Sequence, residues 1–375
     1  MKFGDFPAWV RDTTLRLFPH RTRPGLRAIG EPDAAAPIVV TGNFTLTVRR
    51  MIETLEGRDV WLLVADSQGI NVWCAAGGGD LTHHEVIAAV RACALSSRVS
   101  HRMLILPQLA ATGVEPHKIT ATTGFETRWG PARLEDLPAY LDRGYRTVKR
   151  DRYMRFPLWE RMEMAVMWAA PMTPILMLVV WLFIDLRTAL VCGTIAVVMV
   201  FGLLAAVPYV PIVGAKRFVT FVALTIFGAT LGSTALFAVG SPTLVQLLGV
   251  AIAASVVTLV LSVDLTGSTP WFPSYINSFK NRFDVELVED RCTGSARCVL
   301  VCPKNVFEMD GRRRKVRIAR PDDCLRCGAC VVQCPEDALQ FRFADDRIVP
   351  PSVVRTTRMN MLGRRSISVE TGKDS

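Results

Sequence analysis

The chain has 375 residues, of which 50% are apolar and 21% are charged, and it carries a formal net charge of +10. That length predicts two or three domains, and the mean hydropathy of +0.28 is high for a purely soluble protein. Ten cysteines would suggest disulfides in a small secreted chain. Most of them, however, lie within residues 292–334 at metal-ligand spacings, and the first residues lack the apolar run of a signal peptide. We therefore expect a protein that faces the reducing cytoplasm.

Residues 36–150 follow an N-terminal extension over residues 1–35 and alternate between short apolar runs and amphipathic stretches. This alternation is typical of a Rossmann-like α/β domain, in which helices cover both faces of a parallel sheet. Such sheets bind ligands at the carboxyl ends of their strands, where we expect the sequence GINVWCAAGGGD at 69–80. The strands are expected at 37–42, 59–65 and 102–107, and the helices at 45–57 and 83–95.

Cys74 lies in that glycine-flanked stretch, far in sequence from the cysteine-rich segment. The stretch lacks the GxGxxG spacing of a dinucleotide site and the Gly-Lys-Ser/Thr of a P-loop. Taken alone, Cys74 is most simply a buried structural cysteine. Cys93 and Cys192 are interpreted as packing residues, and His83 and His84 as exposed residues near a helix start rather than metal ligands.

Residues 158–264 predict a transmembrane domain of four helices. Each apolar stretch has about 20 residues, enough to cross a hydrocarbon core of about 30 Å as a helix. A fifth span would arise if Pro171 and Pro174 broke the first stretch. Glu163, near the start of that stretch, is expected to reach water. The spans are expected at about 162–184, 188–207, 218–239 and 243–263.

Basic residues gather on one side of these stretches, and an excess of Lys and Arg marks the cytoplasmic side of a membrane. We therefore expect a multi-pass protein of the inner (cytoplasmic) membrane, in contact with lipid, whose soluble domains both face the cytoplasm. The residues that carry this prediction are Arg150, Arg152, Arg155, Arg161, Lys216 and Arg217.

A linker over 265–285 precedes a predicted ferredoxin domain over 286–345 and a tail over 346–375. The sequence CLRCGACVVQCP at 324–335 has the spacing of bacterial two-cluster ferredoxins. In these α+β domains three cysteines of a motif bind one 4Fe-4S cluster and the fourth binds the other cluster. Four cysteines followed by proline at this spacing make a zinc site a remote alternative.

The cysteine motif occurs twice, offset by 32 residues, because Cys292 corresponds to Cys324. The same shift brings Cys327 onto Ser295. Ser295 leaves three possibilities open: a 3Fe-4S cluster, a 4Fe-4S cluster whose fourth iron binds oxygen, or no cluster. With the fourth cysteines exchanged between motifs, the complete set is Cys302, Cys324, Cys327 and Cys330, and the incomplete set is Cys292, Cys298, Cys334 and Ser295.

The sequence GRRRK at 311–315 separates the two motifs and could suggest a nucleic-acid contact. It has no interleaved aromatic residues and no recognition helix beside it. We interpret it as the solvated turn of a hairpin and expect no nucleic-acid partner.

Four stretches resemble HgcA, the family of membrane corrinoid proteins of microbial mercury methylation: TGNFTLTVRR, DVWLLVADSQGINVWCAAGGGD, SHRMLILPQLAATGV and VDLTGSTPW. The soluble domain of that family is related to the corrinoid-binding domain of the corrinoid iron-sulfur protein. The C-terminal region resembles HgcB, the ferredoxin partner of the family. The chain therefore resembles a fusion of the two over about residues 37–340.

The resemblance implies a corrinoid-binding domain in which NVWCAAG forms a cap helix beneath a base-off cobalamin. Cys74 would be the lower axial ligand of cobalt and the catalytic residue. The implied activity is a corrinoid-dependent methyl transfer from methyl-cobalt to an acceptor, with the ferredoxin returning cobalt to its reduced state. The remaining residues of the implied cofactor site are Asn71, Val72, Trp73, Ala75, Ala76 and Gly77.

The implied partners are a methyl-donor protein or methyltetrahydrofolate-linked methyltransferase, a low-potential electron donor, and mercuric ion or another methyl acceptor. The chain departs from the family pattern in having Gly78 where the family has lysine, in Ser295, and in having no cysteine after Cys334. Two alternatives stay open: a corrinoid methyl carrier with a non-mercury acceptor, and a membrane-anchored iron-sulfur module that only transfers electrons.

Overall fold

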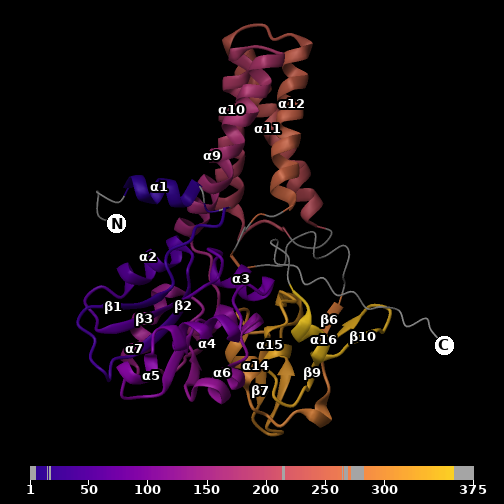
Figure 1. Cartoon of the computed structure of the whole chain (residues 1–375). Helices are drawn as coiled ribbons and strands as arrows, with labels where there is room; N and C mark the ends of the chain where they lie inside the picture. Colours follow the sequence, from indigo (N-terminus) through magenta and orange to yellow (C-terminus); the bar gives the residue numbers. More distant parts are fainter. Residues whose placement is uncertain are drawn as a thin grey trace, which may run out of the picture. The chain divides into compact units, whose positions relative to one another are not determined.

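The computed structural model describes residues 6–14, 16, 18–212, 216–263, 265, 269–271 and 283–358. Contacts between residues divide the chain into two units, which are shown in Figure 1. One unit contains the N-terminal helix and the four long helices. The other contains an α/β lobe within residues 19–155 and a ferredoxin-like lobe within residues 281–375. The linker expected over 265–285 lies mostly outside the described residues, as does the tail beyond Arg358.

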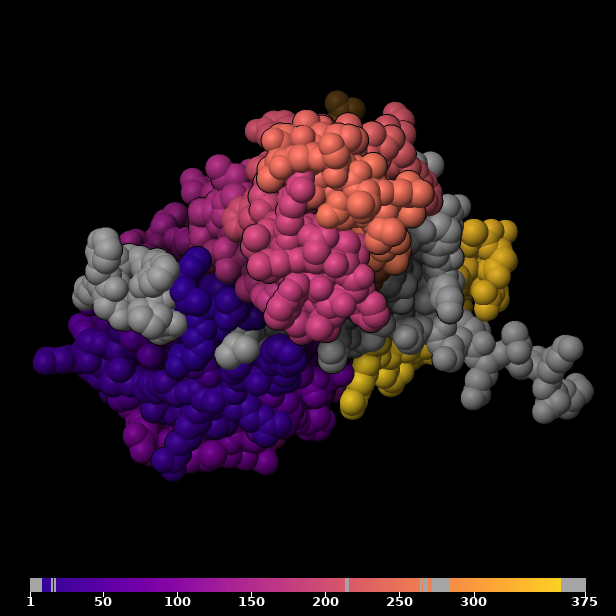
Figure 2. All heavy atoms as spheres, turned by 90° about the horizontal axis from the view of Figure 1, so that it is seen from above, coloured from indigo at the N-terminus to yellow at the C-terminus, as the bar shows by residue number. Residues whose placement is uncertain are grey.

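The four long helices match the four predicted spans, and each is long and apolar enough to cross a membrane. Pro171 and Pro174 lie inside the first helix, which continues through them, so they do not break it in the way that a fifth span would require. Seen from above, the helices gather into one bundle coloured pink to orange (Figure 2). They are α9 (Leu158–Phe183), α10 (Leu186–Ala206), α11 (Arg217–Val239) and α12 (Leu244–Val263).

Small residues let the helices of this bundle approach closely. A side chain at Gly232 of α11 would lie 2.6 Å from Val250 of α12. The hydroxyl of Thr225 donates to that of Thr258 at 3.0 Å, which joins the same two helices. Close backbones and interhelical hydrogen bonds are typical of packing within membranes, where water does not drive helices together.

Glu163 does not reach water, contrary to the sequence expectation, but is buried in the first unit. The short helix α1 (Phe6–Thr14) packs on α9, and Trp9 donates its indole N–H to a Glu163 oxygen at 3.1 Å. Arg16 lies 3.6 Å from the other oxygen. The N-terminal extension therefore supplies partners for a carboxylate that would otherwise be costly to bury.

The α/β lobe contains a five-stranded sheet in the order β1-β3-β2-β4-β5. The strands β2 to β5 are parallel, with Val40 opposite Leu63 and Leu106 opposite Trp129. The three predicted strands are confirmed as β2, β3 and β4, whereas β5 and the antiparallel edge strand β1 were not predicted. The bounds are β1 (Gly25–Ile29), β2 (Ile38–Gly42), β3 (Val60–Ala65), β4 (Met103–Leu106) and β5 (Glu126–Trp129).

Helices cover both faces of this sheet, as predicted. Alternate strand residues point to opposite cores, so that Leu63 faces a cluster with Val86 and Ile119 while Leu62 faces one with Met51 and Tyr140. The first face carries α4 (His83–Ala92) and α6 (Pro116–Thr123), and the second carries α2 (Thr45–Thr54) and α7 (Leu137–Asp142).

The ferredoxin-like lobe has a small antiparallel sheet of three strands and a separate two-stranded hairpin. The hairpin pairs Phe307 with Ile318, and its turn carries the exposed arginines of the GRRRK sequence, as predicted. The sheet contains β6 (Phe283–Leu287), β9 (Leu339–Phe343) and β10 (Ile348–Val349), and the hairpin contains β7 (Phe307–Asp310) and β8 (Lys315–Ile318). Three short helices accompany them: α14 (Arg297–Val301), α15 (Ala329–Val332) and α16 (Pro351–Thr356).

Candidate functional site

The stretch around Cys74 forms the short helix α3 (Val72–Gly78), as the resemblance implies. Asn71 begins the helix, because its side-chain oxygen accepts a hydrogen bond from the Cys74 amide at 3.0 Å. Gly79 ends it with a φ of +88°, a left-handed conformation that favours glycine. The predicted cofactor-site residues Val72, Trp73, Ala75, Ala76 and Gly77 are buried on this helix, whereas Cys74 is half-buried.

Asn43 holds the loop that leads into α3, a role that the sequence analysis did not assign. It follows β2, is buried, and accepts hydrogen bonds from the amides of Ser67 and Gly69 at 2.9 and 2.8 Å. Its amide group also donates to Asp66 at 2.9 Å. These contacts fix the carboxyl end of β3, and hence the start of the Cys74 helix, against the end of the neighbouring parallel strand.

The segment η2 (Gln108–Thr112) closes over α3 from the end of β4. Gly113, the residue after η2, has no room for a side chain, because a Cβ would collide with the carbonyl oxygen of Ala76. Val72, Ala75 and Ala76 face the core of the α/β lobe. Cys74 is instead partly buried with Leu109 and Trp129, at the carboxyl ends of β4 and β5.

A second small core joins α3 to the ferredoxin-like lobe. Its buried members from the α/β lobe are Trp73 and Ala111, and Cys74 packs against it. Cys327, a candidate cluster ligand, belongs to the same core. The other members from the ferredoxin-like lobe are Val301, Leu325 and Ala329. One predicted metal-binding region is therefore in contact with the helix that carries Cys74.

The cysteines of the predicted complete set lie near enough to act on one another. Burial raises the pKa of Cys330 well above that of an ordinary thiol, and the neighbours that add to this rise include Cys324, Cys327 and Cys302. Backbone amides donate to two of the sulfurs: the Val306 N–H to Cys302 at 3.3 Å and the Arg326 N–H to Cys324 at 3.4 Å. Amides that point at sulfur stabilise thiolates bound to iron.

The incomplete set lies around one small cavity in the ferredoxin-like lobe. Cys292, Ser295, Cys298 and Cys334 all line it, together with Glu336. Burial raises the pKa of Cys298 to about 12, and the neighbouring Cys334 and Cys292 add to this rise. The Ala338 N–H donates to the Cys334 sulfur at 3.2 Å.

The donor sets fit iron-sulfur clusters better than zinc. Within the described residues, no three His, Cys, Asp or Glu side chains converge on one point where a single metal ion could bind. A cubane cluster does not require such convergence, because each cysteine binds a different iron. Burial raises the pKa of Cys324 to about 12, and a bound metal would favour the thiolate form of this side chain.

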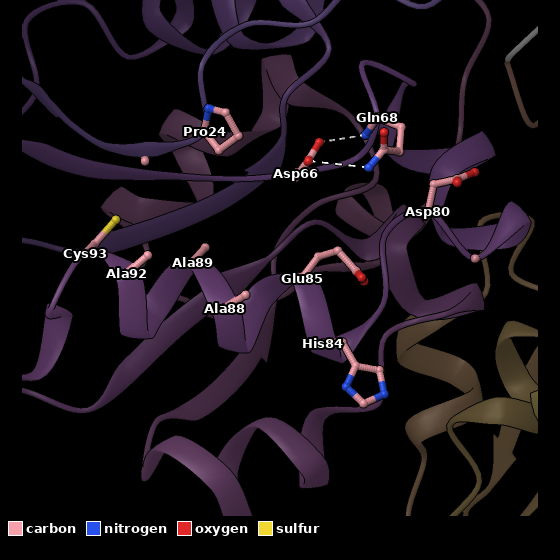
Figure 3. Close-up of a pocket in the computed structure, with 12 residues that line it drawn as sticks. Pro24, Asp66, Gln68, Asp80, His84, Glu85, Ala88, Ala89, Ala92 and Cys93 are labelled. Carbon is pink, nitrogen blue, oxygen red and sulfur yellow. Dashed lines mark hydrogen bonds between the residues drawn. The ribbon is translucent and has the colours of Figure 1, made fainter.

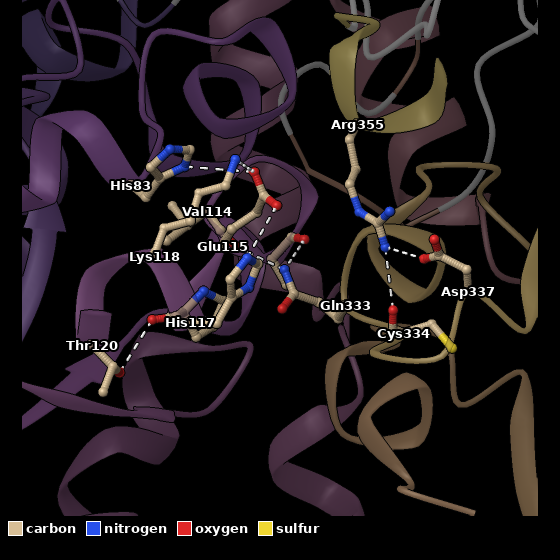
Figure 4. A network of polar contacts seen from close by, with 12 residues as sticks. His83, Val114, Glu115, His117, Lys118, Thr120, Gln333, Cys334, Asp337 and Arg355 are labelled. Atoms are coloured by element: carbon tan, nitrogen blue, oxygen red, sulfur yellow. Dashed lines mark hydrogen bonds and ion pairs between the residues drawn. The ribbon is translucent and has the colours of Figure 1, made fainter. Parts of the chain in front are cut away.

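Gln333 lies between Cys330 and Cys334 in the sequence and makes polar contacts with the α/β lobe (Figure 4). Its buried amide donates to the carbonyl oxygens of Ala111 at 2.9 Å and Val114 at 2.7 Å. On the opposite side, Arg355 donates to the Cys334 carbonyl oxygen at 3.2 Å and pairs with Asp337. The lobes are thus joined by hydrogen bonds as well as by apolar packing.

His83 is buried rather than exposed, which corrects the sequence expectation, while His84 is exposed as expected. The His83 ring nitrogen lies 3.7 Å from Glu115, which also pairs with Lys118 at 2.7 Å (Figure 4). Burial lowers the pKa of His83, and the charge of Lys118 lowers it further. His83 therefore favours its neutral form in the folded protein.

A second contact between the lobes lies beside Cys302 of the complete set. The Met154 N–H donates to the Pro303 carbonyl oxygen at 2.8 Å, directly after Cys302. The Lys304 ammonium lies 5.0 Å from the centre of the Tyr153 ring. Arg152, half-buried at the end of α8 (Lys149–Arg152), places its positive charge close enough to act on Cys302.

A larger pocket opens beside α4, away from these cysteines (Figure 3). Its floor consists of Ala88, Ala89 and Ala92, and Cys93 lies at one end. Cys93 also packs partly against the core of the lobe, in keeping with its predicted packing role. Glu85, on the wall, is engaged in capping α4 through Thr82. The described pocket thus presents small apolar residues and carboxylates, without a candidate metal ligand set.

Comparison with known proteins gives two family matches. Residues 14–141 match the model described as CO dehydrogenase/acetyl-CoA synthase delta subunit, and residues 283–338 match the one described as 4Fe-4S dicluster domain. The first match contains the Cys74 helix, and the second contains both cysteine sets. The C-terminal domain is therefore ferredoxin-like, and the N-terminal domain resembles a subunit of an acetyl-CoA synthase system.

Curated relatives of the α/β region are gamma subunits of acetyl-CoA decarbonylase/synthase complexes. The Methanopyrus kandleri protein is 34% identical over 127 residues, which are 33% of this chain and 27% of the relative. The gamma 2 subunit of Methanosarcina mazei is 39% identical over 121 residues, 31% of this chain and 25% of the relative. The gamma subunit of Methanocaldococcus jannaschii is 36% identical over 96 residues, which are 25% of this chain and 20% of the relative. The chain thus spans about a quarter of the length of these relatives.

Proposed function

We propose that the protein is a membrane-bound, corrinoid-dependent methyltransferase with its own iron-sulfur reductase. The observation that carries this proposal is the shared core of Trp73, Cys74 and Cys327, which joins the predicted cap helix to a predicted cluster ligand. An electron-transfer lobe packed on the cofactor helix suits a cofactor that must be kept reduced. The similarity to acetyl-CoA synthase subunits and to 4Fe-4S dicluster domains supports the same pair of roles.

The residues around Cys74 fit a corrinoid. The helix α3 turns Ala75 and Ala76 into the core and leaves the Cys74 sulfur half-buried at the carboxyl ends of parallel strands, where α/β sheets bind their ligands. Thiolate is a soft, strongly donating ligand that suits a low-valent transition metal. Trp129, which is partly buried against the same core as Cys74, would offer an apolar ring surface to a macrocycle.

Cobalt bound here would supply methyl transfer chemistry, and the protein supplies its surroundings. Asn71 orients the Cys74 helix by capping it, and Asn43 fixes the preceding loop. The complete set of Cys302, Cys324, Cys327 and Cys330 would act as the nearer electron donor, because one of its ligands shares a core with Trp73. Fusion in one chain keeps donor and acceptor at a high effective concentration.

The four apolar helices would anchor both lobes to the inner membrane, with the lobes in the cytoplasm. Lipid, a methyl-donor protein and a low-potential electron donor are the proposed partners. Mercuric ion is the acceptor that the resemblance suggests. Gly78, in place of the lysine of that family, favours testing other acceptors beside it.

The test is to purify the full chain in detergent without oxygen and to measure cobalt, iron and the visible spectrum after adding cobalamin. We expect about one cobalt per chain and a corrinoid spectrum that changes in Cys74→Ala. Cys93→Ala, a change of the same kind in the same lobe, should leave the spectrum unaltered. The proposal fails if the reduced protein binds no cobalamin. Iron without cobalt would instead identify an electron-transfer module.

Methyl transfer to mercuric ion then separates the two candidate acceptors. Protein loaded with methylcobalamin should form methylmercury at a rate that Cys74→Ala reduces at least about tenfold. A cobalamin-loaded protein that forms no methylmercury would be a methyl carrier for another acceptor.

A further inference from the structure

The two cysteine sets have the same spacing but different surroundings. Cys327, of the complete set, is 9% exposed and belongs to the core shared with Trp73. Ser295, its counterpart 32 residues earlier, is exposed. We call the position of one iron atom in a cubane cluster a corner. The corner beside Cys327 would be shielded from water, whereas the corner beside Ser295 would be open to it.

The equivalent positions after the two motifs also carry opposite charges. Lys304, two residues after Cys302, is buried, and the position 32 residues later is Glu336, which is exposed. Glu336 lines the same cavity as Ser295 and the three cysteines of the incomplete set. That cavity therefore has three sulfur donors and three oxygen-bearing side chains, Thr293, Ser295 and Glu336, of which Glu336 supplies a carboxylate.

Three cysteines can hold three irons of a cubane, and the fourth iron must take another ligand. Oxygen donors bind a sulfide-bridged iron less strongly than thiolate does, and they suit harder divalent cations. A departing ion is also hydrated at once in an exposed position, whereas burial would oppose its release.

We propose that the fourth corner of the incomplete set is an exchangeable divalent-metal site with oxygen ligands from Ser295 and Glu336. In the oxidised resting cluster, [4Fe-4S]²⁺ releases Fe²⁺ and leaves [3Fe-4S]⁰, so charge balances and no electron is transferred. Fe²⁺ or another divalent cation of similar size enters by the reverse step. The three-iron and four-iron forms are then two states of one site. This proposal concerns the ferredoxin-like lobe and does not depend on a bound corrinoid.

The test uses the full chain in detergent with both clusters reconstituted without oxygen. The protein is treated with a chelator and desalted, and a sample is oxidised by one electron with ferricyanide. We expect a loss of about one iron in eight and the appearance of the paramagnetic signal of [3Fe-4S]⁺. Adding Fe²⁺ to the unoxidised sample should restore the iron, and Zn²⁺ should compete with it.

Two variants assign the corner to its residues. Ser295→Cys should retain all its iron under the chelator, because a fourth thiolate closes the corner. Glu336→Gln should bind added Fe²⁺ about tenfold more weakly, since it loses the carboxylate. Glu289→Gln, a matched change at an exposed carboxylate of the same lobe outside the cavity, should behave as the unaltered protein.

Retention of all iron by the unaltered protein would overturn the proposal, because the corner would then be fixed. Iron equal to a single cluster before chelation would overturn it as well, because the cavity would hold no cluster. Both results concern iron alone. Cobalamin binding, which tests the proposed function, is measured separately on the same preparation and can fail or succeed independently.

Discussion

The ferredoxin-like lobe repeats one motif, but its two cysteine sets have different surroundings. Val301, Leu325 and Cys327, which comes from the complete set, are buried in a core shared with Ala111 and Trp73 of the α/β lobe. The cavity of the incomplete set is lined by exposed Ser295 and Glu336. The surroundings, and not the motif alone, therefore give each cluster its properties. Fusion to a second lobe can protect one metal centre while leaving its repeat open to solvent.

The largest effect is expected from removing Cys302, which tests how the ligands are shared between the two motifs. Cys302 belongs to the first motif by sequence but lies with Cys324, Cys327 and Cys330. Cys302→Ala should lose about half of the cluster iron and keep the exchangeable corner beside Ser295.

Cys334→Ala is the matched change and should have the opposite result, losing the exchangeable corner and keeping the cluster of the complete set. Iron analysis and paramagnetic resonance distinguish the two. If Cys302→Ala removed the Ser295 centre instead, the exchange of fourth cysteines between the motifs would be wrong.

The next largest effect concerns the hydrogen bonds by which Gln333 joins the ferredoxin-like lobe to the α/β lobe. Gln333→Leu removes the donor to the Ala111 and Val114 carbonyl oxygens, which we expect to cost about 1–3 kcal/mol of docking free energy. Hydrogen exchange should accelerate at the amides of residues 108–114. Gln340→Leu, at a buried amide that binds Glu286 within its own lobe, should not accelerate it there. Equal acceleration in both variants would mean that Gln333 has no specific docking role.

Acid should weaken the same side of the α/β lobe through His83. Its folded pKa is lowered from 6.5 by burial and by the charges of Lys118 and His84, against the opposing charges of Glu115 and Glu85. The unfolded chain therefore binds more protons between the lowered pKa and 6.5, so stability falls as the pH drops through that window.

The pH effect is measured as the denaturation midpoint of the full chain between pH 7.5 and about 5. His83→Asn should flatten the fall within that window. His84→Asn, the exposed neighbour, should leave it unchanged. A fall of the same size in His83→Asn would assign the acid sensitivity to other groups.

The smallest effect is expected at Arg152, which the α/β lobe places near Cys302 of the complete set. A positive charge stabilises the reduced cluster, so Arg152→Gln should make its reduction potential more negative by a few tens of millivolts, where about 59 mV is a tenfold change for one electron. Arg355→Gln, beside Cys334, should act on the other cluster. A redox titration followed by paramagnetic resonance measures the reduction potential of each cluster. An equal shift of both potentials in Arg152→Gln would show that Arg152 does not act on the complete set alone.

Local patterns were sufficient to predict much of this architecture. The four helices and the strands at Val40, Leu63 and Leu104 are continuous apolar runs, and the hairpin follows from the ferredoxin motif. The edge strands β1 and β5 escaped prediction because neither is a continuous buried apolar run: Ala28 of β1 and Arg128 of β5 are exposed. Short edge strands are stabilised by their neighbours rather than by their own sequence.

The site was predicted only in part, because its contacts join distant segments. The candidate cluster ligands were found from their spacing, and Cys74 was found from the family resemblance. By contrast, the burial of His83 depends on Glu115 in a later helix, and the role of Asn43 depends on the loop after the next strand. Nothing local to Gln333 indicates that it binds the α/β lobe. The sequence TGNFT at 41–45 contains a signal that predicts a structural role for Asn43, since a polar residue at the end of a buried strand needs a hydrogen-bond partner.

In the membrane-bound protein proposed above, the Gln333 contact also limits how the chain can cross the bilayer. Gln333 and Ala111 are 222 residues apart in sequence, and all four apolar helices lie between them. Two residues that touch must be on one side of a bilayer, so the intervening chain must cross it an even number of times. A chain with one helix left uninserted could not form this contact. The lobes can therefore join only after the last helix has been synthesised and inserted, which makes their docking a late step in biogenesis.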